Sequence, residues 1–400
     1  MPLLTRDRRN VLVLAICQML FNSGRSLIVA TAPLIAYGIA ADKSLATLPH
    51  ALVIVGTALL TFPASLLMRR LGRRAGFVVG AVIGAAGAAV CVVAVSQSHF
   101  WAFCLGTLLF GTASGFAQHY RFAATDVAAP EFRAKAVSLV LAGGVAAAIL
   151  GPELAKLGKD LFASTEFLGG YVFLIGLTLS TALAVMLLDI PPLTPAEKAE
   201  PGRPLSVIMR QPVFIVAVTA TTVAQGSMNL LMTATPIAMH KAHHLFGDIA
   251  LVIEWHSVLM FAPGFFTGSL VKRWGELPMI LAGLVIITLS VFIALAGDTV
   301  FLFWASMSLL GFGWNFAFTA STSMLIGAHT PSERAKTQGV VNSIVYGTAA
   351  VAALSAGSLL HNVGWAGVGW VPLPFLAVAL AVVIHHGWGS GPAPSDRKTL

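Results

Sequence analysis

The chain alternates long apolar segments with short polar ones along its whole length. An α-helix that crosses a bilayer needs about 20 mainly apolar residues. Segments of this kind recur throughout the sequence, and each predicts a membrane-spanning helix. The twelve predicted helices cover residues 11–38, 49–68, 76–96, 100–124, 136–157, 168–188, 213–239, 248–270, 277–297, 299–324, 338–360 and 370–387.

The longest polar interruption is the stretch 190–212. It is rich in proline and charged residues, including Pro191, Pro192, Glu197 and Lys198. Such a composition disfavours a continuous helix and is typical of a linker. We therefore predict an all-α integral membrane protein with an N-terminal six-helix bundle at 1–189, a cytoplasmic linker at 190–212 and a C-terminal six-helix bundle at 213–400.

The two predicted bundles repeat one another in sequence. Residues 22–27 (NSGRSL) align with residues 225–230 (QGSMNL), 203 positions later, and the RLG at 70–72 aligns with the RWG at 273–275. The loop at 130–135 aligns with 331–336 at an offset of 201. Parallel repeats in an apolar chain are typical of transporters whose binding site lies between the two halves.

Composition and charge agree with a membrane protein. The chain is 57% hydrophobic and only 10% charged, whereas a soluble domain carries about 25% charged residues. The net charge of +8 does not indicate a nucleic-acid partner, because the charges form short clusters between apolar segments. The three cysteines lie in apolar segments without metal-ligand spacing. We expect a monomer with no cofactor and no metal, whose partners are the lipid bilayer and a small-molecule solute.

Most of the 24 Lys and Arg residues lie in the N-terminal segment, in alternate connections, in the linker and in the C-terminal segment. Because basic residues favour the cytoplasmic side, both termini are predicted to be cytoplasmic, with the protein in the cell inner (cytoplasmic) membrane. The first apolar segment follows basic residues, as the core of a signal peptide does. It is too long for such a core and has a repeat partner at 213–239, so we interpret it as the first spanning helix.

Polar side chains form a stripe on the first predicted helix. Gln18, Asn22 and Arg25 are spaced by three and four residues, which places them on one helical face. The same stripe recurs on the seventh helix, where Gln225 and Asn229 lie 203 positions after residues 22 and 26. We expect these groups to contact the solute. The alternative is that they hold helices together through hydrogen bonds.

Two arginines fall inside predicted helices. Arg25 lies near the middle of its helix, where an arginine costs about 2.5–3.5 kcal/mol on insertion scales. It must therefore face water, a carboxylate, or an anionic or carbonyl-bearing ligand; the alternative is a structural ion pair, with Glu254 as candidate partner. Arg121 lies nearer the cytoplasmic end of its helix. The alternative to solute contact for Arg121 is an ion pair at the surface with Asp126 or Glu131.

Two groups that could carry a coupling proton lie in the eighth predicted helix. Glu254 and His256 can each bind and release a proton. They are two residues apart, about 200° around a helix, so they cannot both face the centre of a cavity. We treat both as proton-coupling candidates. The alternative for each is a hydrogen-bonded structural role.

The turn between the second and third helices resembles a signature of the major facilitator superfamily. That family has Gly-x-x-x-Asp-Arg-x-Gly-Arg-Arg at this place, and residues 65–74 read SLLMRRLGRR. By this resemblance Gly72, Arg73 and Arg74 form a gating loop. Ser65 and Arg69 replace the family's Gly and Asp, so the charge relay that closes the cytoplasmic side in the family is lost here or uses other partners.

The resemblance implies a central cavity lined by the first, fourth, seventh and tenth helices. In such a transporter the cavity opens to the two sides of the membrane in turn, which is called alternating access. Helix four then contributes Gln118 and Arg121, and helix ten contributes Trp314 and Asn315. Aromatic residues near the polar stripes would suit a planar, polar-edged solute. The predicted substrate-binding residues are Gln18, Asn22, Arg25, Gln118, Arg121, Gln225, Asn229, Trp314, Asn315 and Tyr346.

The segment 255–268 (WHSVLMFAPGFFTG) resembles a branch of bacterial permeases that includes a riboflavin importer. Riboflavin uptake by a secondary active transporter is therefore our best prediction. Proton-coupled efflux of drugs or metabolites is an alternative, supported by a partial glycine signature at 143–152; a siderophore permease is another. A membrane enzyme or a non-transporting receptor would differ in moving no solute. The sequence holds no glycine-rich phosphate loop with a lysine, so an ion gradient or the solute's own gradient is the expected driving force.

Overall fold

The computed structural model describes residues 5–129, 132–190, 203–330 and 333–389, and all regular structure in these ranges is helical. The first half contains α1 (Arg6–Ile39), a short 3₁₀ helix η1 (Lys43–Leu45), α2 (Leu48–Leu71), α3 (Arg73–Ser96), α4 (Phe100–Ala117), α5 (Tyr120–Val127), α6 (Arg133–Lys159) and α7 (Leu168–Met186). The second half contains α8 (Leu205–Met209), α9 (Pro212–Lys241), α10 (Phe246–Phe261), α11 (Gly264–Trp274), α12 (Glu276–Leu295), α13 (Val300–Ile326), α14 (Arg334–Trp370) and α15 (Pro372–Gly389).

Several boundaries differ from the sequence prediction. The predicted helix at 100–124 is interrupted at Gln118 and His119, which separate α4 from α5. The predicted helix at 248–270 is bent by 42° between α10 and α11, where Pro263 has no backbone N–H to donate. The predicted linker holds the short helix α8, and the predicted gap at 361–369 belongs to α14, in which Gly364 alone is non-helical.

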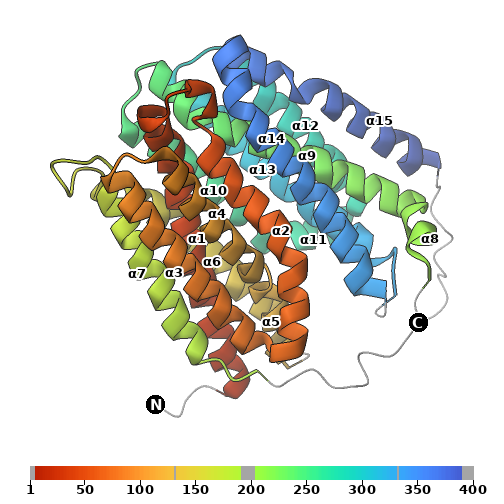
Figure 1. Ribbon diagram of the computed structural model, residues 1–400. Coiled ribbons are helices and arrows are strands. Elements are labelled where there is room, and N and C mark those ends of the chain that lie inside the picture. The colour runs from red at the N-terminus through yellow and green to blue at the C-terminus, as the bar shows by residue number, and fades with distance from the viewer. Residues whose placement is uncertain (1–4, 130–131, 191–202, 331–332, 390–400) are drawn as a thin grey trace, which may run out of the picture.

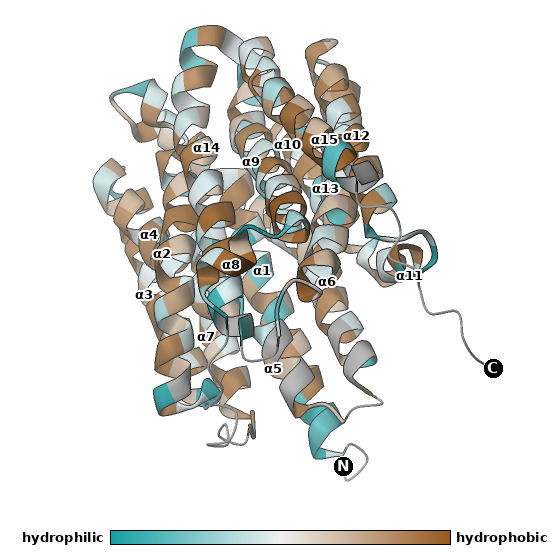
Figure 2. Cartoon of the chain, turned by 90° about the vertical axis from the view of Figure 1, so that its right-hand side faces the viewer, coloured by the Kyte–Doolittle hydropathy of each residue, from teal (hydrophilic) through white to brown (hydrophobic). Residues whose placement is uncertain are grey.

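Ten helical stretches of the described chain are long and apolar enough to cross a membrane, or eleven if α10 and α11 form one bent span. Large apolar side chains are exposed along them; Leu183, Val351 and Phe301 are 66%, 67% and 69% exposed. Figure 2 shows apolar residues along the helices and polar residues mainly at loops and ends. This apolar exterior is suited to lipid and not to water.

Each half packs mainly on itself, and the same pairs of helices recur in both. In the first half α1 packs on α6, and α4 packs on α2 and α3. In the second half α9 packs on α14, and α13 packs on α10 and α12. The repeat seen in the sequence is therefore also a repeat in packing.

Two glycines show how closely the repeated helices approach. A methyl group added at Gly111 of α4 would lie within 3.0 Å of the backbone of Val53 on α2. A methyl group added at Gly311 of α13 would lie equally close to the carbonyl of His256 on α10. Positions 53 and 256 are separated by 203, the offset of the repeat. Small residues of this kind allow helix backbones to pack closely in membranes.

The two basic turns also share one backbone conformation. Gly72 ends α2 with φ 88° and donates its N–H to the carbonyl of Met68. Gly275 ends α11 with φ 87° and donates to the carbonyl of Val271. A left-handed residue of this kind favours glycine, because a side chain would clash with the backbone.

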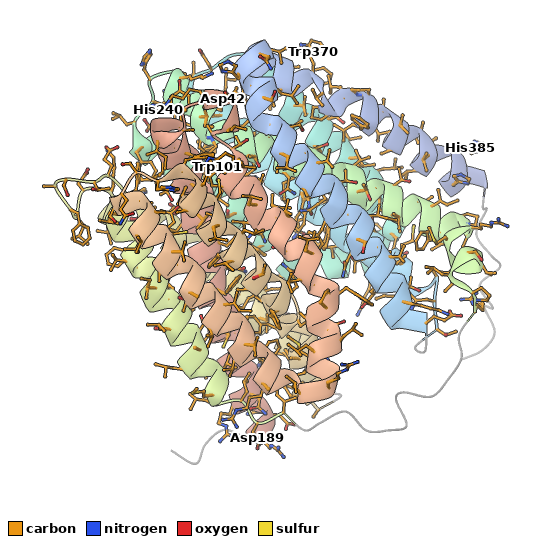
Figure 3. The ribbon with its side chains drawn as sticks, viewed as in Figure 1. Asp42, Trp101, Asp189, His240, Trp370 and His385 are labelled. Carbon is orange, nitrogen blue, oxygen red and sulfur yellow. The ribbon has the colours of Figure 1, made fainter. Side chains whose placement is uncertain are left out.

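The two halves meet mainly through α2 with α14, α6 with α10, and α1 with α9. Figure 1 shows the helices converging at one end of the molecule and diverging toward the other. Figure 3 places Asp42 and His240 at the converging end, which we call the far side, and Asp189 at the opposite end, which we call the linker side. On the far side the rings of Tyr37 and His240 lie 5.8 Å apart, and those of Phe167 and Phe246 lie 4.8 Å apart.

Two ion pairs hold the backbone near the predicted linker, one at Asp189 just before it and one at Arg203 within it. Asp189 pairs with Arg6 at 2.6 Å and exchanges hydrogen bonds with Asn10. Arg203 donates to both carboxylate oxygens of Glu333, each at 2.8 Å, and its backbone N–H donates to the same group at 2.6 Å. These hydrogen bonds, followed by one from the backbone of Thr330, hold the pKa of the Glu333 carboxyl well below its ordinary range.

We predict that Gly111→Ala destabilises the protein. The added methyl group has no space between α4 and α2, and overpacking of this kind typically costs about 1–3 kcal/mol. The measurement is the melting temperature of the purified protein in detergent. Gly176→Ala is the matched control, because nothing lies within 4 Å of the position that its methyl group would take. Equal melting temperatures for the two variants would contradict this packing.

We also predict that Glu333→Gln lowers the melting temperature in a pH-dependent way. Because the folded pKa is lowered, the stabilisation is complete above the ordinary carboxyl pKa of 4.5 and is lost as the pH falls toward the folded value. The difference in melting temperature between wild type and variant should be constant from about pH 8 to 5 and should become smaller below that range. Glu166→Gln is the control, since its exposed pair with Lys159 contributes little. A gap that widens in acid would contradict the assignment.

Candidate functional site

The cavity between the two halves consists of two adjoining chambers that share five lining residues, among them Arg25. The wide chamber has about 780 Å³ of empty space, open solvent included. It is lined by Gln18, Phe21, Asn22, Arg25, Ser114, Ala117, Gln118, Val140, Leu141, Gln225, Met228, Met260, Phe261, Trp314, Phe318 and Tyr346.

Helix geometry brings amides and aromatic rings together in the wide chamber. The indole N–H of Trp314 donates to Gln225 Oε1 at 2.9 Å, and the Trp314 ring stacks on Phe318 with centroids 4.5 Å apart. The Tyr346 hydroxyl donates to Gln118 Oε1 at 3.2 Å across the two halves. Gln118 caps the C-terminal end of α4, so the interruption of the predicted helix lies beside the chamber.

The deep chamber adjoins the wide one and has about 580 Å³ of empty space, open solvent included. It is lined by Asn22, Arg25, Ser26, Val29, His50, Gly144, Ala147, Ala148, Met228, Asn229, Met232, His256, Ser257, Met260 and Phe261. On α1 the wide chamber uses positions 18–25 and the deep chamber positions 22–29. On α6 and α9 the lining positions shift in the same direction along the helix. The deep chamber is therefore about one helical turn nearer the far side.

Arg25 lies at the junction and lines both chambers. No ion pair of Arg25 is found among the described residues. The alternative partner, Glu254, instead lies 4.0 Å from Lys156 of α6, which in turn pairs with Glu153 at 2.6 Å. Within the described ranges, therefore, the guanidinium lines the cavity and pairs with no carboxylate.

The two proton-coupling candidates lie in different surroundings. Glu254 lines neither chamber and belongs to the cluster with Lys156 and Glu153 between α10 and α6. His256 is buried, lines the deep chamber, and makes a 2.8 Å hydrogen bond from Nδ1 to the carbonyl of Met307. As expected from their spacing, the two side chains do not share one face.

Most of the predicted substrate-binding residues meet at the cavity. Asn315 does not line it, because its amide bonds to the Met260 carbonyl at 2.8 Å and to the Thr267 hydroxyl at 2.7 Å, beside the bend between α10 and α11. The side chain of Arg121 lies outside the described part of the structure. Gly72, Arg73 and Arg74 lie at the turn between α2 and α3, on the linker side, and line neither chamber.

Sequence reasoning did not single out His50, which lines the deep chamber from the first turn of α2. A lone histidine near a helix end carries no periodic signal, and its repeat counterpart is Ile253. Ser26 follows Asn22 by four residues and so continues the polar stripe of α1. Its place in a second chamber follows only from the packing of α2 and α10 around it.

Comparison with known proteins identifies the family. The profile of the Major Facilitator Superfamily matches residues 14–247 and 217–399. The chain is 40% identical over 382 residues to the riboflavin transporter RfnT of Brucella anthropi, covering 95% of this chain and 96% of that protein. It is 29% identical to the uncharacterized MFS-type transporter YdeG of Bacillus subtilis, over 94% of this chain and 90% of that protein.

The fold agrees with this assignment. It matches the crystal structure of the human organic anion transporter MFSD10 (TETRAN) with a TM-score of 0.67 at 15% identity, covering 95% of this chain and 100% of that one. At this identity the likeness concerns the fold alone. With its family profile, its relatives and its apolar helices, the chain belongs to the Major Facilitator Superfamily and is a multi-pass membrane transporter.

Proposed function

We propose that this transporter carries riboflavin into the cell as a secondary active permease. The observation that supports this most is the 40% identity to a protein named as a riboflavin transporter, which extends over nearly the full length of both chains. The resemblance of segment 255–268 to the same branch of permeases points to the same solute.

The wide chamber is suited to a flavin ring. Phe21, Phe261, Trp314, Phe318 and Tyr346 supply aromatic surface on which a flat heteroaromatic ring can stack. Glutamine side chains on α1, α4 and α9 can both donate and accept hydrogen bonds. The guanidinium of Arg25 can donate to the carbonyl oxygens at the polar edge of the ring.

We propose that the chain crosses the membrane twelve times, as two six-helix bundles at 1–189 and 213–400 joined by the cytoplasmic linker 190–212. The stretch Lys336–His386 counts as one apolar stretch but has 51 residues, so it would be about 77 Å long. This is more than twice the thickness of a bilayer core, about 30 Å. The structure has eleven candidate spans when α10 and α11 are counted as one bent span. Counting α14 and α15 as two spans instead of one gives twelve.

The orientation proposed from the basic residues places the linker side in the cytoplasm of a cell with its transporter in the inner membrane. The gating loop at Gly72, Arg73 and Arg74 then lies at the cytoplasmic surface. The transporter would act as a monomer by alternating access, with the two halves rocking about the chambers. Drug or metabolite efflux and siderophore uptake are the alternatives, and a panel of solutes in counterflow would separate them.

We predict that Arg25→Ala abolishes most riboflavin uptake while leaving the amount of protein in the membrane unchanged. A charged hydrogen bond to the solute is worth about 1.5–3 kcal/mol, which corresponds to a loss of affinity of about 10- to 150-fold. The measurement is saturable uptake of labelled riboflavin by proteoliposomes. Arg9→Ala removes an exposed arginine outside both chambers and is the matched control. Normal uptake by Arg25→Ala would refute the site, and no uptake by the wild type would refute the solute.

We predict that an imposed proton gradient accelerates uptake and that either Glu254→Gln or His256→Gln removes the acceleration while riboflavin exchange continues. Exchange needs no net proton movement, whereas coupled uptake does. Loss of coupling in Glu254→Gln would identify the carboxyl that faces Lys156 as the group that carries the proton. Loss of coupling in His256→Gln would identify the imidazole in the deep chamber as that group. Glu166→Gln controls for the loss of an exposed carboxylate. Proton coupling by these residues is contradicted if both variants still respond to the gradient.

A further inference from the structure

The deep chamber contains buried polar atoms that the protein leaves without hydrogen bonds. Among the described residues, Ser26 Oγ and His50 Nδ1 are buried and have no partner, and both residues line this chamber. Their side chains come from α1 and α2, and the two residues are 8% and 4% exposed. A buried polar group without a partner costs free energy, so a ligand that supplies the missing hydrogen bonds would bind here favourably.

Other polar side chains also line the deep chamber. Asn22 and Arg25 supply hydrogen-bond donors at the junction with the wide chamber. Asn229 and His256 enter from α9 and α10, so the polar groups surround the chamber from both halves. The residues between them are small or flexible, such as Ala147 and Met232.

The two chambers differ in the surface that they offer. The wide chamber has five aromatic side chains of the Phe, Tyr and Trp types, whereas the deep chamber has only Phe261, which it shares with the wide one. The wide chamber is therefore better suited than the deep one to stack a flat ring system. The deep chamber is lined by polar groups that can donate or accept hydrogen bonds. Such groups match hydroxyl groups, because each hydroxyl does both.

We propose that the deep chamber binds the hydroxylated chain of the solute while the wide chamber holds its ring. This inference rests on the proposed function, in which riboflavin supplies a flavin ring and a ribityl chain with several hydroxyl groups. Ser26 and His50 then determine specificity, because they recognise the part of the molecule that distinguishes riboflavin from other flavins.

The test compares three flavins as competitors of labelled riboflavin uptake in proteoliposomes. Lumiflavin has the same ring with a methyl group in place of the ribityl chain, and the 5′-phosphate of riboflavin adds a negative charge to the end of that chain. We expect Ser26→Ala and His50→Ala each to weaken inhibition by unlabelled riboflavin about tenfold, the effect of losing one hydrogen bond of roughly 1.4 kcal/mol. Inhibition by lumiflavin should not change, so the preference of wild type for riboflavin should fall.

The control is Ser308→Ala, which removes another buried hydroxyl without a hydrogen-bond partner, from a residue that lines neither chamber. It should retain the full preference for riboflavin. His50→Gln, which keeps a hydrogen-bonding side chain, should restore part of the preference and provides a second variant if His50→Ala does not fold.

The outcomes separate the two proposals. Saturable riboflavin uptake by wild type, with equal loss of riboflavin and lumiflavin inhibition in the variants, overturns the chamber assignment but leaves the proposed function intact. Stronger inhibition by the phosphate ester than by riboflavin also overturns it, because the deep chamber would then select an anion. Absence of riboflavin uptake by wild type overturns both.

Discussion

The guanidinium of Arg25 is the group on which the arrangement of this transporter depends. It lies midway along a helix that is otherwise apolar enough to cross a membrane, and a charge in that position must be solvated. The protein provides no carboxylate for it among the described residues. It provides instead a cavity at the meeting of α1, α6, α9 and α10 that is lined in part by polar side chains. The two chambers therefore supply the solvation that this cation requires, and they are also the site at which we propose that the solute binds.

The internal repeat separates the scaffold from the chemistry. Gly72 and Gly275 share one backbone conformation, and Gly111 and Gly311 allow equivalent helices to approach closely. At the same offset of 203, however, Arg25 corresponds to Met228, and His256 corresponds to Val53. A duplicated scaffold with unequal side chains produces a cavity that differs from one half to the other. Such a cavity can hold a solute whose two ends differ chemically.

The sequence predicts the helices and the repeat well because both depend on local pattern. Apolar length predicts the spans, and the stripe of Gln18, Asn22 and Arg25 predicts which face of α1 is turned to the cavity. The roles of Asn315 and Glu254 depend instead on neighbours distant in sequence. The Asn315 amide donates a hydrogen bond to the carbonyl of Met260, and the Glu254 carboxylate lies near the Lys156 ammonium. His50 could not be found from pattern for the same reason, since its place in the deep chamber results from the packing of α2 against the second half.

The contacts that close the far side must separate if a solute is to reach the deep chamber from there. The ring contacts of Tyr37 with His240 and of Phe167 with Phe246 join the two halves at this end, and an aromatic pair contributes only about 0.5–1.5 kcal/mol beyond its buried area. The pair of Glu254 with Lys156, at 4.0 Å and partly exposed, adds little. The larger contact between the halves is the packing of α2 on α14, where Ala51, Ile54, Ala349, Ala350 and Ala353 form a buried apolar cluster. The alternating access that we propose would therefore have to separate this cluster as well as the ring contacts, while each half keeps its own internal packing.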